Sequence, residues 1–230
     1  MVSGKLLVRL IVQSGAWIIF MGAVLFISAG NWRWPEGWAF LAIFTGGSIG
    51  FCVWLWRKDP ALLISRLEPL QQKDQAPWDK VFMLCAITAW NVWLVVMALD
   101  AQRWQTSHVP VWLEVIGGIL IVAGFAATMP VFSANSFAAP AVRIQKVRGH
   151  HVIDTGPYAI VRHPMYAAAI LYLVGLPLML GSWIGLAVVP FLVLGFAPRA
   201  VREERMLAHE LPGYAEYMTR VRWRLVPHIW

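Results

Sequence analysis

The chain is 230 residues long, and 59% of its residues are hydrophobic whereas only 13% are charged. Soluble domains average about 25% charged and about 45–50% apolar residues, so this composition excludes an ordinary water-soluble domain. The formal net charge of +7 would suit nucleic acid, but no basic stripe on a soluble domain is present to bind it, and basic residues of membrane proteins collect in cytoplasmic loops beside anionic lipid. We therefore expect a single membrane domain over residues 1–230 and no nucleic acid partner.

Four apolar segments are long enough for a membrane-spanning helix, which needs about 20 residues. They are residues 7–29, 37–56, 79–99 and 111–133. The first exceeds the core of a secretory signal peptide, which has about 7–15 apolar residues, so we interpret it as an uncleaved span.

A fifth apolar stretch, residues 165–198, is too long for one span and too short for two full spans with a loop. Pro177 and Gly181-Ser182 lie in its middle, where a helix would break. We therefore predict an all-α polytopic bundle with about six spans, the last two forming a helical hairpin of two short arms.

The distribution of Lys and Arg supports an even number of spans, because cytoplasmic loops carry an excess of basic residues. With the N-terminus inside, all of the 19 basic residues except Arg33 and Arg103 fall on the inner side. We expect both termini to be cytoplasmic. The chain then divides into four N-terminal spans over 1–133, with a cytoplasmic loop at 57–80, and a catalytic region over 134–230 with the hairpin at 165–198 and a cytoplasmic tail.

Two smaller features also predict local structure. The segment Pro60–Leu70 is typical of a short interfacial helix within the cytoplasmic loop. The pairs Gly46/Gly50 and Gly181/Gly185 have the small-xxx-small spacing of close helix contacts.

Two segments on the expected cytoplasmic side carry specific polar residues: 149–166 and 199–217. Because the hairpin joins them, both return to the same face of the membrane, and a site shared between them follows from the topology. In the first segment Gly156-Pro157 predicts a turn, and Pro164 suits the first position of a helix whose free N–H groups would hold a polar ligand group. The second holds Glu203-Glu204, and carboxylates just below a membrane core are costly unless they pair or bind something.

These features also have structural interpretations. Arg162 and His163 would serve as interfacial residues beside lipid phosphate. Glu203-Glu204, among three arginines, would serve as a salt-bridged helix face. Taken alone, neither the Arg162-His163 pair nor the Glu203-Glu204 pair decides between this structural interpretation and a functional one.

The tyrosines and histidines predict less. Tyr214 and Tyr217 are more typical of packing or interfacial residues. His150, His151 and His163 lack the spacing of metal ligands, so we expect no metal site. The sequence has no Gly-rich phosphate loop, nucleophile elbow or paired-cysteine motif.

In combination, these motifs resemble the isoprenylcysteine carboxyl methyltransferase family, and phospholipid methyltransferases share much of the pattern. The resemblance rests on Gly156-Pro-Tyr158, Arg162-His-Pro-Met-Tyr166, Glu203-Glu204, Gly213-Tyr-Ala-Glu-Tyr217 and Val221-Arg-Trp-Arg-Leu-Val-Pro227. Upstream, Arg57-Lys-Asp-Pro60, Arg66-Leu67 and Trp78-Asp-Lys80 look like bacterial members. The resemblance covers residue 57 to the C-terminus and implies a bacterial protein, so we expect the cytoplasmic membrane, with the site facing the cytoplasm as the distribution of Lys and Arg predicts.

The resemblance implies an S-adenosylmethionine-dependent methyltransferase that has no Rossmann domain. It assigns the cofactor to residues of both segments: His150, His151, Val152, Ile153, Gly156, Pro157, Tyr158, Arg162, His163, Pro164, Met165, Tyr166, Glu203 and Glu204. It makes Arg199 or Arg202 the candidate for steering or holding the acceptor, and Glu203 a further catalytic candidate. The implied acceptor is lipophilic or lipidated, with a carboxylate such as that of isoprenylcysteine or a lipid amine or hydroxyl.

The chemistry of methyl transfer is compatible with these residues. A methyl sulfonium is already activated, so the protein mainly aligns the acceptor and excludes water. A carboxylate acceptor needs no general base, whereas an amine or hydroxyl does, and a glutamate or His163 would provide it.

Two alternatives remain open from the sequence. A sterol-type membrane reductase that uses NADPH carries a similar Arg-His-Pro-x-Tyr stretch, although Glu203-Glu204 with Gly213-Tyr-x-x-Tyr217 favours the methyltransferase. A transporter or scaffold would place ionisable residues near the bilayer midplane, and here Asn91 and Glu114 are the main polar residues within the spans. The oligomeric state stays open.

Overall fold

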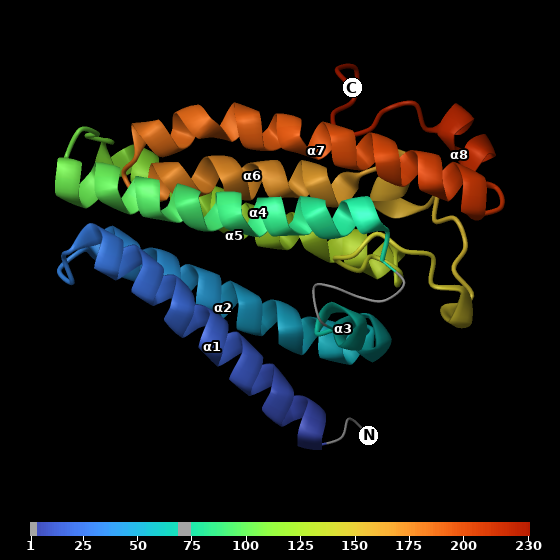
Figure 1. Ribbon diagram of the computed structural model, residues 1–230, viewed down its shortest axis with the longest axis horizontal. Helices are drawn as coiled ribbons and strands as arrows, with labels where there is room; N and C mark the ends of the chain where they lie inside the picture. The colour runs from blue at the N-terminus through green and yellow to red at the C-terminus, as the bar shows by residue number, and fades with distance from the viewer. Residues whose placement is uncertain (1–3, 69–74) are drawn as a thin grey trace.

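The structure is a computed structural model that describes residues 4–68 and 75–230. For residues 4–7 it describes the backbone alone. Its helices are α1 (Gly4–Ala29), α2 (Pro35–Lys58), α3 (Pro60–Arg66), α4 (Pro77–Ala98), α5 (Val111–Ala134), α6 (Pro164–Met179), α7 (Trp183–Glu210) and α8 (Tyr214–Arg220). A π-helical stretch, Leu99–Trp104, continues α4, and 3-10 turns lie at Lys146–Arg148 and Gly156–Ala159. Helices α4 to α7 run roughly parallel in one group, and α1 and α2 form a pair beside it (Figure 1).

The described helices confirm a multi-pass, all-α membrane bundle. Five helical segments are long and apolar enough to cross a membrane: Val8–Ala29, Pro35–Lys58, Pro77–Trp104, Val111–Ala134 and Trp183–Glu210. Their outer faces carry large apolar side chains such as Ile19 and Phe191, which are 74% and 73% exposed and suit contact with lipid. Helix α6 is apolar but has only 16 residues, about 24 Å at 1.5 Å per residue against a hydrocarbon core of about 30 Å.

The predicted hairpin is present, but its arms are unequal. The chain turns at Gly181, which has φ +79°, and at Ser182, whose hydroxyl accepts a hydrogen bond from Gly185 N–H. Pro177 does not break the helix as expected, because it lies two residues before the end of α6, where the Ser182 N–H donates to its carbonyl. The second arm is not short, because α7 runs without interruption through Pro198 to Glu210.

Helices α5 and α6 approach each other backbone to backbone at Gly117 and Gly175. A Cβ added at Gly117 would lie 2.5 Å from Met179 N and 2.6 Å from Gly175 O, so no larger residue fits there. The predicted contact at Gly46/Gly50 is wrong, because an added Cβ meets nothing within 4 Å at either glycine. In the other predicted pair, a Cβ added at Gly185 would lie 2.4 Å from Met97 Cγ of α4, so that glycine does mark a close helix contact, whereas the α5–α6 contact was not predicted.

A buried carboxylate anchors the turn end of the hairpin. Asp100 is fully buried and accepts hydrogen bonds from Ser107 Oγ (2.7 Å), Ser182 Oγ (2.5 Å) and Ile184 N–H (3.3 Å), and from the Thr106 hydroxyl. These bonds tie the α6–α7 turn to the end of α4. With one end of the hairpin tied in this way, its other end holds the two polar segments side by side.

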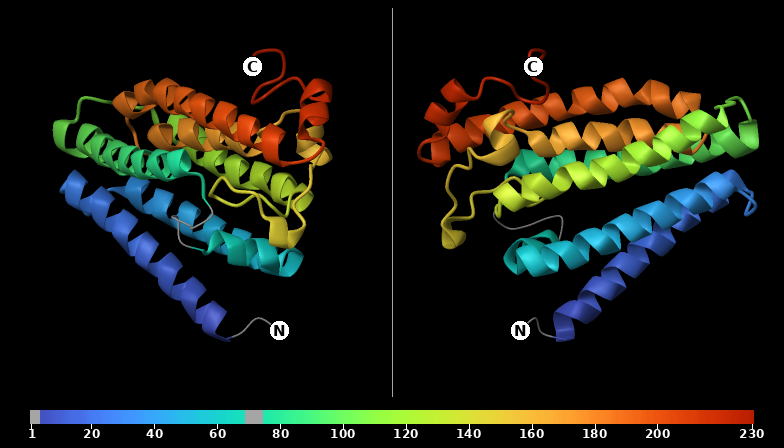
Figure 2. Two further views of the ribbon diagram at one scale, coloured as in Figure 1. Left: turned by 45° about the vertical axis from the view of Figure 1, so that its right-hand side comes forward. Right: turned by 180° about the vertical axis from the view of Figure 1, so that it is seen from behind.

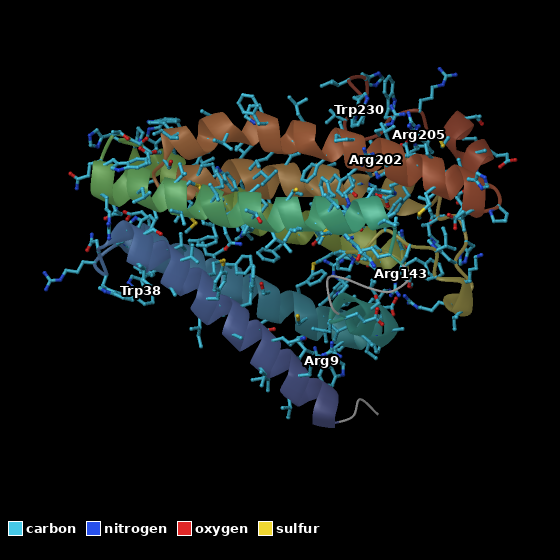
Figure 3. All side chains as sticks on the ribbon, viewed as in Figure 1. Arg9, Trp38, Arg143, Arg202, Arg205 and Trp230 are labelled. Atoms are coloured by element: carbon cyan, nitrogen blue, oxygen red, sulfur yellow. The ribbon has the colours of Figure 1, made fainter. Side chains whose placement is uncertain are left out.

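Basic side chains gather at the end of the bundle that carries α3 and α8. Arg143, Arg202 and Arg205 lie at this end, whereas Trp38 lies at the opposite end (Figure 3). The first turn of α1 and the C-terminus also lie toward the α3 and α8 end in each view (Figure 2). This arrangement agrees with the charge bias, and the cytoplasmic orientation stays a prediction. The interfacial helix forms as α3 over Pro60–Arg66, while Leu70 and the predicted inner residue Lys73 lie outside the described residues, as does the Lys5 side chain.

Candidate active site

Glu204 joins the two polar segments of the sequence. Its side chain on α7 is 3% exposed and faces three donors: Arg162 Nε at 2.7 Å, Arg224 Nε at 2.8 Å and His163 Nε2 at 3.1 Å. Arg162 and His163 immediately precede α6, so this cluster closes the open end of the hairpin. The expected meeting of the two segments is thus present in the structure.

The C-terminal tail is bound to the same cluster. Arg162 Nη1 donates to the carbonyls of Val221 and Arg222 at 2.7 and 3.0 Å. The backbone N–H groups of Arg162 and His163 donate to the carbonyls of residues 223 and 224. The tail therefore holds the start of α6 in place, and the carboxylate of Glu204 is fully engaged in this framework.

A polar cavity of about 100 Å³ lies beside the cluster. Its walls come from the α5–α6 connection, the start of α6, the end of α7 and helix α8. The predicted residues that line it are His150, His151, Val152, Ile153, Tyr158, Arg162, His163, Pro164, Met165, Tyr166 and Glu203. Ligand cavities generally enclose about 300–1,000 Å³, so a nucleoside-sized ligand requires this cavity to widen.

Among the described residues that line this cavity, Glu203 is the only one with a carboxylate. Its side chain is 25% exposed, accepts a hydrogen bond from Tyr166 Oη (2.9 Å) and lies 3.9 Å from His163 Nδ1. The rings of His163, Tyr166 and Phe196 stack in sequence, with centroids 5.2 and 5.1 Å apart. This stack orients the hydroxyl that holds Glu203 and leaves the carboxylate able to receive a ligand.

The five other predicted site residues do not line the polar cavity. Gly156 and Pro157 form the expected turn, in which Gly156 has φ +58°. Glu204 lies in the framework described above. Arg199 is buried and bonded elsewhere, and Arg202 is exposed with its guanidinium 5.8 Å from the Trp78 ring.

Arg199 belongs to a second buried ion pair, which the sequence did not reveal. Its Nε donates to Asp79 Oδ1 (3.0 Å) and its Nη2 to the carbonyl of Pro140 (2.6 Å). Asp79, at the start of α4, is fully buried and also accepts bonds from Gln75 Nε2 (2.8 Å) and Val142 N–H (2.9 Å). The pair fixes residues 140–142, part of one wall of the polar cavity, against α4 and α7. Arg199 thus positions that wall and does not contact the cavity itself.

A further wall of the cavity, formed by residues 135–143, was not predicted from the sequence. Asn135, Phe137 and Val142 line the cavity, and the Phe137 ring stacks on His150 with centroids 4.5 Å apart. The segment follows the fourth span and has no distinctive motif, so only its position in the fold identifies it. Tyr214 and Tyr217, for which the sequence predicts packing or interfacial roles, both pack and line the cavity.

His150 and Tyr158 are among the groups of the cavity that have displaced pKa values. Burial, together with the neighbouring His151 and Arg148, lowers the pKa of His150 from 6.5 to about 4, so its ring is neutral and its Nδ1 accepts a hydrogen bond from the Gln145 N–H. Burial also raises the pKa of Tyr158 to about 12, so its hydroxyl stays protonated at neutral pH. The cavity therefore offers neutral hydrogen-bonding groups beside the carboxylate of Glu203.

A second, larger cavity of about 640 Å³ lies between the membrane-spanning helices. Its walls are apolar and come from α2 and α4 to α7. Among the described lining residues, Arg66 of α3 is the only charged one. Met165, in the first turn of α6, lines both this apolar cavity and the polar cavity. A polar ligand and a lipophilic one would therefore meet across Met165.

The fold and the site define a class: a multi-pass helical membrane protein with a polar cavity at one end of the bundle that adjoins an apolar cavity between the helices. Residues 112–211, which include α6, α7 and almost all of α5, match the family model described as phospholipid methyltransferase. This match confirms, over that segment, the predicted resemblance to the integral membrane methyltransferases.

One curated relative is named cobalt-zinc-cadmium resistance protein CzcN, from Cupriavidus metallidurans. It is 38% identical to this chain over 84 residues. The match covers 35% of this chain and 38% of the relative, so the chain spans well under half of that protein's length.

Proposed function

We propose that this protein transfers a methyl group from S-adenosylmethionine to a lipophilic acceptor within the membrane. The observation that carries the proposal is that a polar cavity and an apolar cavity share Met165, in the segment whose family is that of membrane methyltransferases. We further propose that the protein resides in a bacterial cytoplasmic membrane with the polar cavity facing the cytoplasm, because its basic residues gather at that end.

The residues that line the polar cavity fit the cofactor by charge and polarity. Glu203 presents a carboxylate to a ligand with a positively charged amino group and sulfur, and Tyr158 and His150 offer neutral hydrogen-bonding groups. Val152 and Leu207 provide apolar surface for a nucleoside base. We expect the cavity to widen by movement of its irregular walls. Residues 135–145 and 149–155 form no helix, and only the short 3-10 turn at Lys146–Arg148 lies between them.

When bound, the cofactor supplies a methyl group on a positively charged sulfur, which is already activated for transfer. The protein has to bring the acceptor into line with that methyl group and keep water away. Met165 lies at the shared wall and excludes water with its apolar side chain, while the Arg162–Glu204 ion pair fixes the helix start on which Met165 stands.

The type of acceptor decides whether Glu203 has a second task. A carboxylate acceptor attacks without a base. An amine or hydroxyl has to lose a proton, and Glu203 is the carboxylate in reach among the described residues of the polar cavity. The Tyr166 hydroxyl donates to Glu203 and keeps it oriented toward that position.

Direct binding to detergent-purified protein tests the proposal. Calorimetry with S-adenosylmethionine, S-adenosylhomocysteine and NADPH should show saturable binding of the two S-adenosyl compounds and none of NADPH. Glu203→Gln should weaken this binding, whereas Glu210→Gln, on an exposed part of α7, should not change it. Preferential binding of NADPH would favour the reductase, and absence of binding by all three compounds to folded protein would favour a non-enzymatic role.

A further inference from the structure

The apolar cavity has a wall of aromatic rings rather than of aliphatic side chains alone. Tyr172 of α6 stacks on Trp90 of α4, with centroids 5.8 Å apart and planes 29° apart. Phe44 and Phe125 meet the Tyr172 ring edge-on at 6.0 and 6.1 Å. All four rings line the cavity, so its middle is a rigid aromatic surface.

The hydroxyl of Tyr172 has no hydrogen-bond partner among the residues that the structure describes, although it is buried. Other tyrosines of the site are paired, since Tyr166 donates to Glu203 and Tyr217 to the carbonyl of Tyr158. Buried polar groups in proteins are nearly always paired, and an unpaired one is costly. Phenylalanine would provide the same ring contacts without this cost, so packing does not account for the hydroxyl.

The position of Tyr172 on α6 relates it to the site of methyl transfer. Met165, which lines both cavities, precedes Tyr172 by seven residues on the same helix. Seven residues are nearly two full turns, so both side chains lie on one face, about 10 Å apart along the helix axis. Tyr172 thus stands on α6 about 10 Å, measured along the helix axis, from Met165 at the wall where the two cavities meet.

We propose that the apolar cavity selects a lipophile that carries a hydrogen-bonding oxygen or nitrogen part-way along its body, and that Tyr172 is the residue that recognises it. This inference rests on the proposed function and deepens it, because it describes the methyl acceptor. A plain hydrocarbon chain leaves the hydroxyl unpaired, whereas an acceptor with a hydroxyl, ketone or ether oxygen near its middle pairs it. A site built around such a bond discriminates strongly against an analogue that lacks the polar atom.

Equilibrium binding of two labelled probes to the full-length purified protein tests this proposal. The probes are stearic acid and a hydroxystearic acid with its hydroxyl near the middle of the chain. Wild-type protein should prefer the hydroxylated probe. Tyr172→Phe should lower affinity for that probe by roughly 5- to 100-fold and change stearic acid binding by less than about 2-fold.

Thr128→Val is the matched control, because Thr128 also lines the cavity but its hydroxyl already donates to the Phe125 carbonyl at 2.7 Å. The control should keep the wild-type preference, and the thermal midpoint of Tyr172→Phe should equal or exceed that of wild type. No preference in the wild type, an unchanged preference in Tyr172→Phe, or a preference lost equally in both variants would overturn the proposal.

Binding of S-adenosylmethionine, measured on the same preparations, separates this inference from the proposed function. Its absence from all proteins, together with a probe preference that depends on Tyr172, would refute methyl transfer and leave the cavity's selectivity intact.

Discussion

Replacing each of the adjacent glutamates of α7 by glutamine should give two different defects. Glu204 is 3% exposed and meets Arg162, His163 and Arg224, whereas Glu203 is 25% exposed and meets the neutral hydroxyl of Tyr166. We expect Glu204→Gln to reduce stability and Glu203→Gln to reduce cofactor binding.

The structure sets the size of both effects. Glutamine at position 204 keeps one acceptor oxygen but leaves the guanidinium of Arg162, which is only 7% exposed, without its counter-charge. Breaking a buried ion pair in this way costs about 3–5 kcal/mol, or roughly 6–20 °C in the unfolding midpoint of a chain of this size. Glutamine at position 203 removes a charge-assisted bond to the ligand, about 1.5–3 kcal/mol, which is about 10- to 100-fold in affinity.

Thermal unfolding in detergent and calorimetric titration with S-adenosylhomocysteine, applied to both variants, measure these effects separately. Glu210→Gln, an exposed substitution on the same helix, is the control in both assays. The reasoning would be refuted if Glu204→Gln unfolded at the wild-type temperature, or if Glu203→Gln bound the ligand as tightly as wild type.

Three further substitutions have effects that the packing predicts. Gly117→Ala should lower the unfolding midpoint because its Cβ would meet backbone atoms of α6, whereas Gly118→Ala, with 3.5 Å to its nearest neighbour, should not. Ser182→Ala removes a bond to Asp100 and the cap of α7, and should cost about 1–3 kcal/mol in the free energy of unfolding without changing cofactor affinity. His150 has a pKa of about 4 in the folded protein, below its ordinary 6.5, so the unfolded chain takes up its proton first and stability should fall as the pH drops from about 6.5 to 4. In a series of thermal scans His150→Phe, which keeps a ring against Phe137, should flatten that pH dependence, and an unchanged slope would contradict the interpretation.

The spans and the loops that share a side could be predicted, because they depend on the length of the apolar runs and on the distribution of Lys and Arg. The length of each apolar run predicts a span, and the asymmetry of Lys and Arg predicts which loops share a side. The end of α7 could not be predicted in this way. Residues 199–210 are polar enough to be interpreted as a separate cytoplasmic segment, yet they continue the same helix.

The roles within the site depend on contacts that sequence does not encode locally. Glu203 and Glu204 differ by one helical step of about 100°, and only the neighbouring elements decide which one faces the cavity. Asp79 looks like an ordinary charge at the start of a span, but the fold buries it against Arg199. Tyr172 lies in an apolar run, where nothing in the sequence indicates that its hydroxyl lacks a partner.

Photo-crosslinking of methyl-labelled S-adenosylmethionine to the purified protein, followed by peptide mapping, tests the central claim most directly. The structure predicts that label is incorporated into peptides from 135–166 or 199–217, and that excess S-adenosylhomocysteine suppresses it. Label confined to other segments, or incorporation that S-adenosylhomocysteine does not suppress, would contradict the assignment of the polar cavity as the cofactor site.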